Sequence, residues 1–362
     1  MHRRRIAVYI ALAALSWPSA ANRAPAAELT WLDARTLPIE GKGWADTKSH
    51  YDRLPRQAEG VVRQPVWDLG HDCAGLLLHF ASDTPELRVR WTLTRSQLAD
   101  SNMSPSGVSG LDLYVRLDRG WRWLAAARPG TSREGNEGVF FNDIPAERRE
   151  FLLYLPLYNG IESLQLGVPG SRRLEPVVRP GKPIVFYGTS IVQGGCAMRP
   201  GMAYTAILGR HLDEAVINLG FSGNGRAEPE MASLLAELDP AAYVLDCLPN
   251  LGPEGVKRLE PFVGILRKKH PATPIVLIEN LEYPDGVEIP ARKMGYDAAN
   301  QNLRGIYERL VRSDRNLYYV SAPGLIGTDG EATVDGVHPT DLGAMRMADR
   351  IEPLLRSALA GP

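Results

Sequence analysis

The chain has 362 residues, of which 44% are hydrophobic and 23% are charged, and its formal net charge is −1 at pH 7. This length suits two domains that each bury a core of their own. The near-neutral charge offers no electrostatic basis for binding nucleic acid or an anionic membrane surface. The histidines show no metal-ligand spacing, and no phosphate loop or dinucleotide fingerprint occurs, so we expect neither a metal nor an organic cofactor.

The N-terminal residues have the pattern of an export signal. A basic stretch at residues 2–5 precedes an apolar run at 6–15, and small residues follow at 19–26. The apolar run is shorter than the roughly 20 residues of a membrane-spanning helix. We therefore expect residues 1–27 to be a cleaved signal peptide and the mature protein to be periplasmic or secreted, without a membrane span.

Three cysteines in an oxidising compartment allow at most one internal disulfide. Cys196 follows the turn after the predicted strand 184–187 closely, and Cys247 ends the predicted strand 242–247 near the same edge of the sheet. One hypothesis is that these two residues pair and that Cys73 is free. The alternative is that all three are buried thiols.

Residues 28–170 contain short segments with alternating apolar side chains. Such segments, separated by turn signals, predict an antiparallel β-sandwich. The expected strands cover residues 61–69, 75–80, 87–93, 111–117, 121–125, 149–155 and 163–168. Residues 171–183, rich in proline, glycine and arginine, are expected to link this domain to a second one.

Residues 184–362 alternate between strand and helix patterns. The expected strands are 184–187, 215–219, 242–247, 275–279 and 317–320, and the expected helices are 203–212, 228–238, 254–269, 290–312 and 341–359. Right-handed crossovers place helices on both faces of a parallel sheet. The alternation therefore predicts a three-layer α/β/α domain with a flavodoxin-like parallel sheet.

Polar residues follow four strands of this second domain. They are Ser190 after the first strand, Gly223 with its polar neighbours after the second, Asn250 after the third, and Asp335 with His338 after the last. Because the carboxyl ends of parallel strands meet at one edge of the sheet, we expect these residues to lie together. A serine becomes a nucleophile when an imidazole takes its proton and a carboxylate orients that imidazole. The combination indicates acyl transfer.

These segments resemble the SGNH (GDSL-type) hydrolases. The four blocks of that superfamily are similar to Gly188-Thr189-Ser190, Gly223, Asn250 and Asp335-Gly336-Val337-His338. Within it, a bacterial branch of secreted esterases carries an N-terminal β-domain named for a GxDLY signature, which stands here as Gly110-Leu111-Asp112-Leu113-Tyr114. The resemblance covers nearly the whole mature chain. It implies a jelly-roll-like sandwich at 28–170, a linker at 171–183 and an SGNH hydrolase domain at 184–362.

The resemblance also implies a role for each site residue. Ser190 would be the nucleophile, His338 the general base and Asp335 the residue that orients it. The oxyanion hole would consist of the Ser190 and Gly223 amides and the Asn250 side chain. The sequence departs from the family where leucine and proline, rather than a glycine-rich segment, precede Asn250. This departure leaves the reach of Asn250 into the hole open.

Two further segments allow two interpretations each. Residues 280–288 either line the substrate cleft or form an ordinary surface connection. In the GxDLY segment, Asp112 and Tyr114 either stabilise a strand end or contact substrate.

The leading functional interpretation is an exported serine esterase that hydrolyses short-chain acyl esters, in first place O-acetyl esters, on carbohydrates. The acyl size and the carbohydrate rest on the resemblance and on export. Its partner would be a small-molecule or glycan ester, and the final acyl acceptor could be water or a second sugar hydroxyl.

Two other functions stay open. One is a lipid-directed enzyme, such as a lysophospholipase, a thioesterase or a platelet-activating-factor-type acetylhydrolase. Against it, we expect no run of exposed aliphatic side chains in the loops after the third and fourth strands. The other is a glycan-binding scaffold with an idle hydrolase domain.

Overall fold

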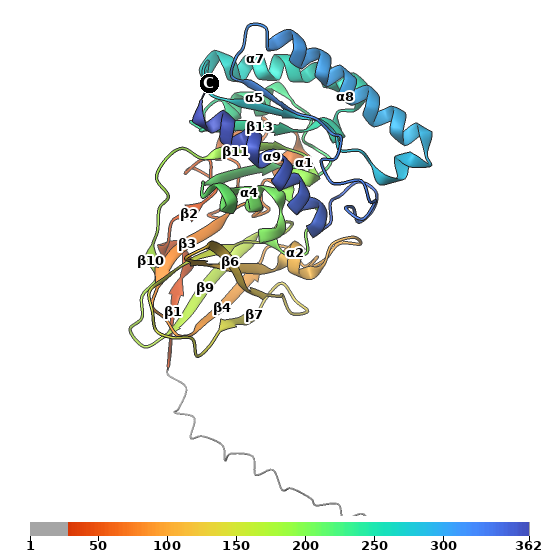
Figure 1. Ribbon diagram of the computed structural model, residues 1–362. Helices are drawn as coiled ribbons and strands as arrows, with labels where there is room; N and C mark the ends of the chain where they lie inside the picture. The colour runs from red at the N-terminus through yellow and green to blue at the C-terminus, as the bar shows by residue number, and fades with distance from the viewer. Residues whose placement is uncertain (1–27, 362) are drawn as a thin grey trace, which may run out of the picture.

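The computed structural model describes residues 28–361, which form an antiparallel β-domain followed by a parallel-sheet α/β domain (Figure 1). This is the predicted fold class. The predicted signal peptide at residues 1–27 lies outside the described residues. Within the described part of the chain, no helix combines the length and the apolar character that crossing a membrane requires.

The β-domain consists of two antiparallel sheets. One has the strand order β1-β9-β4-β7, and the other has the order β10-β3-β8-β5-β6 with β2 paired to β3. The strands are β1 Leu29–Asp33, β2 Ile39–Glu40, β3 Leu77–Ser82, β4 Leu87–Leu93, β5 Leu111–Leu117, β6 Gly120–Ala127, β7 Asn136–Phe141, β8 Arg149–Tyr154, β9 Ile161–Pro169 and β10 Glu175–Pro176.

Alternation along β4 explains how the two sheets pack. Its Leu87, Val89, Trp91 and Leu93 are all buried, whereas the residues between them are partly or fully exposed. The buried side chains share one hydrophobic core with residues of the facing sheet such as Phe151. Period-two patterning therefore predicted this strand correctly, because one face of β4 is buried and the other is not.

The predicted strand at 61–69 is wrong. Gln64–Leu69 forms helix α1, with a proline at its start, where the missing amide proton costs no hydrogen bond. Val66 and Trp67 of α1 pack into the core of the α/β domain and not into the sandwich. The strands β1, β2, β7 and β10 were not predicted, and β10 lies within the expected linker as an edge strand paired with β3.

The α/β domain has a parallel sheet of strand order β12-β11-β13-β14-β15. Its strands are β11 Ile184–Gly188, β12 Val216–Gly220, β13 Ala242–Asp246, β14 Ile275–Ile278 and β15 Leu317–Val320. Its helices are α3 Ser190–Gln193, α4 Tyr204–Leu212, α5 Pro229–Leu235, α6 Gly252–Gly255, α7 Leu259–Lys269, α8 Pro290–Leu310 and α9 Asp341–Ala360. The helix predicted at 254–269 is divided, since a short 3₁₀ turn separates α6 from α7.

The inner strand β11, which pairs with β12 and β13, is buried on both faces. Ile184 and Phe186 pack on the side of α4 and α9, while Val185 and Tyr187 pack on the side of α5, α7 and α8. All four side chains have no exposed surface. A strand covered on both faces has no reason to alternate, which explains its continuous apolar sequence.

The two domains share a hydrophobic core. The cluster beneath α4 and α9 also contains Met103, Val108, Tyr114 and Leu157 of the β-domain, and Figure 1 shows the sandwich on that side of the parallel sheet. The domains approach each other closely at α2 (Pro105–Ser109), where a Cβ on Gly107 would lie 2.2 Å from the carbonyl oxygen of Ala197. The β-domain therefore packs directly on the segment that follows Ser190.

We expect Gly107→Ala to lower the free energy of unfolding by about 1–3 kcal/mol, because backbone atoms must shift to admit the methyl group. Urea denaturation measures this change. Gly264→Ala is the matched control: the site in α7 has open space around the new methyl, so stability should rise by about 0.5–1 kcal/mol. Equal stability of the two variants would contradict this close packing.

Candidate active site

Ser190 lies in a tight turn at the carboxyl end of β11. The strand ends at Gly188, and the Thr189 hydroxyl accepts a hydrogen bond from the Ile191 amide at 3.2 Å, which caps the short helix α3. A Cβ on Gly188 would lie 2.1 Å from the carbonyl oxygen of Asp246, so only glycine allows the ends of β11 and β13 to approach this closely. Ser190 is thereby presented at the carboxyl end of β11.

The structure brings Ser190, His338 and Asp335 into one hydrogen-bonded series. Ser190 Oγ lies 2.8 Å from His338 Nε2, although 148 positions separate the two residues in the chain. His338 Nδ1 lies 2.8 Å from Asp335 Oδ2. The imidazole can therefore take the serine proton at one nitrogen while the carboxylate holds the other.

Backbone and side-chain donors surround the Asp335 carboxylate. Its Oδ1 accepts hydrogen bonds from the amides of Val337 at 3.1 Å and His338 at 2.8 Å, and its Oδ2 accepts one from Asn102 Nδ2 at 2.8 Å. Burial by itself raises the pKa of Asp335, but the donors from His338 and Asn102 outweigh it and lower the pKa to about 2. The carboxylate is therefore ionised at neutral pH.

The expected oxyanion donors lie on loops beside this turn. Ser190 is the first residue of α3, so its amide has no acceptor within the helix. Asn250 ends a 3₁₀ turn after β13, and its Oδ1 accepts a hydrogen bond from the Gly225 amide at 3.2 Å. Gly223 lies in the same loop as Gly225, in a left-handed conformation with φ of 69°. Because one hydrogen bond ties the Asn250 turn to this loop, the two elements are positioned together.

Two buried polar side chains, Gln193 and Arg53, fix the end of β12 and the loop that follows it. No local sequence pattern predicted these contacts. Gln193 donates to Asp72 Oδ2 at 3.0 Å and accepts from the Ser222 amide at 2.9 Å, so it connects the β-domain to the loop after β12. Arg53 is buried and donates to the carbonyls of Asn218 and Gly220 at 3.1 and 2.8 Å. Burial lowers the pKa of Arg53 to about 10. These contacts come from distant parts of the chain.

Asp246 lies beneath the turn that carries Ser190 and takes no part in the hydrogen-bonded series. It is fully buried, and Tyr204 donates its hydroxyl hydrogen to Oδ2 at 2.9 Å. Burial raises the pKa of Asp246 to about 7, although the Tyr204 hydrogen bond opposes the rise. Its carbonyl accepts from the Thr189 amide at 3.3 Å, so the residue supports the turn.

The GxDLY segment joins the two domains. Asp112 has no exposed surface and accepts hydrogen bonds from Trp123 Nε1 at 2.9 Å, Arg199 Nη1 at 2.7 Å and the Gly201 amide at 2.8 Å. Arg199 also donates to the Tyr114 hydroxyl at 2.6 Å. The burial of both side chains rules out direct substrate contact. Asp112 and Tyr114 do more than stabilise the end of a strand, because they bind Arg199 and Gly201 in the segment that follows Ser190.

The hypothesis of a Cys196–Cys247 disulfide is wrong, since Cys73, Cys196 and Cys247 are all free and buried. Cys247 packs into the hydrophobic cluster beneath α5 and α7. Cys196 lies instead beside the hydrogen-bonded series, where its sulfur and one ligand atom each of Asp335 and His338 lie within 4.8 Å of one another. Burial raises the pKa of the Cys196 thiol to about 12. The two thiols thus belong to different environments.

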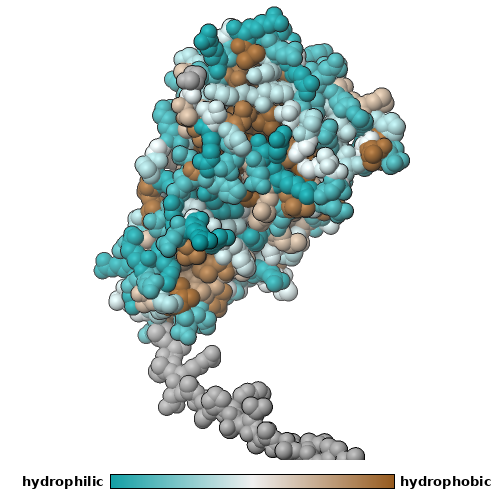
Figure 2. Space-filling model, in the orientation of Figure 1, coloured by the Kyte–Doolittle hydropathy of each residue, from teal (hydrophilic) through white to brown (hydrophobic). Residues whose placement is uncertain are grey.

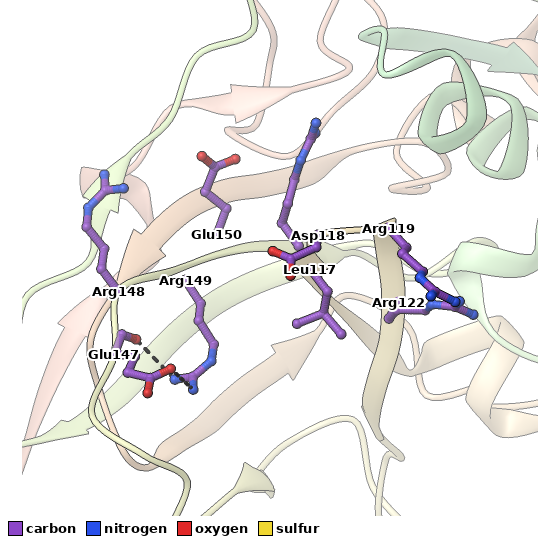
Figure 3. Close-up of a pocket in the computed structure, with 9 residues that line it drawn as sticks. Leu117, Asp118, Arg119, Arg122, Glu147, Arg148, Arg149 and Glu150 are labelled. Carbon is purple, nitrogen blue, oxygen red and sulfur yellow. Dashed lines mark hydrogen bonds and ion pairs between the residues drawn. The ribbon is translucent and has the colours of Figure 1, made fainter.

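Two of the larger cavities are not lined by Ser190, Asp335 or His338. A cavity of about 690 Å³ on the β-domain is lined mainly by arginines and carboxylates, with Arg149 paired to Glu147 (Figure 3). A second cavity, of about 440 Å³, is lined by Tyr283, Tyr296 and parts of the loops after β14 and β15. Residues 280–288 contribute to this second cavity, and their role in a substrate cleft stays a prediction.

Comparisons with known proteins agree with this architecture. The profile of the GDSL-like lipase/acylhydrolase family matches residues 181–356, and the profile of the N-terminal domain of SGNH-hydrolase-type esterases matches residues 29–174. A crystal structure from Bacteroides ovatus, described as that of a GDSL-like lipase, is 34% identical with a TM-score of 0.87, covering 92% of this chain and 99% of its own. The chain belongs to the GDSL-like lipase/acylhydrolase family.

Less similar solved structures share the fold. A salicylyl-acyltransferase from a tetracycline biosynthetic pathway is 20% identical with a TM-score of 0.75, covering 91% of this chain and 97% of its own. An acetyl xylan esterase from the rumen bacterium Butyrivibrio proteoclasticus is 13% identical with a TM-score of 0.56, covering 92% and 99%. A search of curated proteins gave no match. The GDSL-like assignment therefore rests on the profiles and the Bacteroides structure.

The low pKa of Asp335 predicts a pH dependence of stability. Its folded-state pKa of about 2 lies below the ordinary 3.8, so the ionised carboxylate stabilises the folded protein above about pH 4, and this contribution is lost as the pH falls towards 2. We expect the stability difference between wild type and Asp335→Asn, measured by urea denaturation, to be smaller at pH 3 than at pH 6. Asp46→Asn, at an exposed surface carboxylate, is the control. A difference that grows on acidification would refute the assignment.

Proposed function

We propose that this protein is an exported serine esterase that hydrolyses short-chain acyl esters on carbohydrates, with O-acetyl esters as the main substrates. The observation that carries the proposal is the series Ser190 Oγ, His338 and Asp335, with both distances at 2.8 Å, at the carboxyl edge of the sheet. An intact series is the arrangement that a working nucleophile requires, which disfavours an idle hydrolase domain. Export rests on the pattern of residues 1–27.

The reaction would take place in two halves. Ser190 Oγ attacks the ester carbonyl while His338 Nε2 takes its proton, and the imidazolium then donates that proton to the departing sugar oxygen. Water next attacks the acyl-serine through the same imidazole, which releases the acid and restores the hydroxyl. The Ser190 and Gly223 amides and the Asn250 side chain would stabilise the charge on the carbonyl oxygen, and each such donor lowers the activation barrier by roughly 3–4 kcal/mol.

Two features support a bulky alcohol half of the substrate. The His338 and Asp335 side chains are 24% and 32% exposed, so one side of the site is open to solvent. An open site admits a polymer, whereas a deep acyl tunnel would bury the triad. The fold is also shared with carbohydrate esterases, including the acetyl xylan esterase and a family two enzyme from Cellvibrio japonicus with a TM-score of 0.55 at 15% identity.

One observation favours the lipid-directed alternative. We expected no run of exposed aliphatic side chains after the fourth strand, but three apolar side chains are exposed close together there: Val287 and Met294 are 83% and 64% exposed, and Ile289 is also exposed. They lie on the loop after β14 and at the start of α8, next to the cavity of about 440 Å³. Elsewhere on the face in Figure 2, hydrophobic residues stand in groups among hydrophilic ones. The loop could bind an acyl chain.

Hydrolysis of p-nitrophenyl acetate, butyrate and octanoate tests the nucleophile and the acyl size together. We expect kcat/KM to fall steeply beyond butyrate, and Ser190→Ala to lower acetate turnover by about 10⁴-fold or more. Ser233→Ala, at an exposed hydroxyl on α5, should behave like wild type. Undiminished turnover by Ser190→Ala would rule out the proposed nucleophile.

Replacing Val287, Ile289 and Met294 together by serine tests the lipid-directed alternative. The carbohydrate esterase proposal predicts that kcat/KM for p-nitrophenyl acetate and octanoate changes less than twofold, because these side chains would not hold the acyl group. A selective loss of octanoate turnover, with octanoate the better substrate of the wild type, would favour the lipid-directed enzyme.

A further inference from the structure

The loop before α2 ends in a tight hairpin whose tip reaches the catalytic carboxylate. Asp100 and Met103 pair through two backbone hydrogen bonds of 3.0 and 3.2 Å, which leaves Ser101 and Asn102 at the turn. Figure 1 shows this loop of the β-domain beside the loop that precedes α9. Asn102 Nδ2 donates to Asp335 Oδ2 at 2.8 Å across the domain boundary.

The oxygen that Asn102 contacts is the one that faces the imidazole. Asp335 Oδ2 lies 2.8 Å from His338 Nδ1 as well as from Asn102 Nδ2. The other oxygen, Oδ1, is already held by two backbone amides of its own loop. Asn102 is therefore the group from outside that loop that fixes where Oδ2 lies.

The hairpin is anchored, so the position of Asn102 is determined by packing. Met103 is 5% exposed and belongs to the core that the two domains share. Ser104 Oγ donates to the Met198 carbonyl at 3.1 Å, and α2 approaches the Ala197 carbonyl through Gly107. The segment 197–198 follows the nucleophile helix, so the hairpin and Ser190 are held to the same piece of the α/β domain.

We propose that Asn102 is a positioning residue of the catalytic series, through which the N-terminal domain holds Asp335 Oδ2 in line with His338. The inference rests on the proposed function. A carboxylate with a third of its surface exposed can rotate and bind water, and a fixed amide donor restricts both. The β-domain then supplies part of the catalytic machinery.

The hydrogen bond from Asn102 also lowers the affinity of the Asp335 carboxylate for a proton. The Asn102 hydrogen bond contributes to the lowered pKa of Asp335, so removing it leaves a carboxylate that stabilises the imidazolium more strongly. Other charged or titratable groups around the pair are Asp100 on the hairpin, Cys196, Tyr158 beside Gly195 and the His338 ring, and the Asp285–Arg292 ion pair packed on Gly336. Substitutions at 102 leave these groups in place.

The test compares Asn102→Ala, Asn102→Asp and the control Ser101→Ala in the full chain. We expect Asn102→Ala to lower kcat for p-nitrophenyl acetate about 10-fold with KM nearly unchanged, and to move the acid limb of kcat/KM upwards. Asn102→Asp should be worse, with its acid limb about one pH unit higher, since the aspartate cannot donate and adds a negative charge. Ser101→Ala should match wild type.

Aspartate has the same size as asparagine and is equally suited to turns, so Asn102→Asp should leave the hairpin intact and remove only the hydrogen-bond donor. This variant therefore separates a positioning role from a merely structural one. If the side chain only stabilised the hairpin, Asn102→Asp would retain activity and Asn102→Ala would lower thermal stability. Either Asn102→Asp with wild-type kcat and pH profile, or Asn102→Ala within twofold of Ser101→Ala, would overturn the inference.

A measurement without substrate keeps the inference separate from the proposed function. NMR titration of the His338 ring in the Ser190→Ala background should show protonation at higher pH when Asn102→Asp is added, whether or not any ester is hydrolysed. An unchanged midpoint would overturn the role of Asn102 alone. Full turnover by Ser190→Ala would overturn the proposed function alone.

Discussion

The hydrogen bond between Ser190 Oγ and His338 Nε2 is the constraint on which the site depends, because it joins the turn after β11 to a loop near the end of the chain. A contact of 2.8 Å between such distant residues requires both backbones to be placed within a few tenths of an ångström. The parallel sheet provides this placement, since β11 is buried on both faces and its neighbours pair with it in register. Because the loops that carry Ser190 and His338 are attached to this rigid sheet, their positions are restricted as well.

The N-terminal domain takes part in this placement through several independent contacts. Asp112 and Tyr114 hold Arg199 on one side, and Gln193 reaches back to Asp72 on the other. Tyr158 donates to the carbonyl of Ser190 itself at 3.4 Å. These contacts enclose the segment around Ser190, so the sandwich and the α/β domain act as one unit. The shared hydrophobic core explains why the contacts can stay aligned.

Particular elements show why prediction from the sequence succeeded or failed. The strands β4, β5 and β15 were predicted with their observed bounds, because burial on defined faces leaves a clear apolar pattern. Helix α1 was predicted as part of a strand, since a short apolar run carries no period long enough to separate the two. Strand β7 was missed because its glycine and polar residues interrupt the apolar pattern.

The sequence by itself determined the fold class, the family resemblance and the set of residues that meet at the sheet edge, because these depend on local patterns and on the topology of parallel sheets. Only the tertiary structure decided which groups hold the series in place. Asn102 and Gln193 act on partners in other elements, and Cys196 and Cys247 lie in separate environments. Such contacts depend on how the two domains pack, and a hydrogen bond between residues 233 positions apart leaves no periodic trace in the chain.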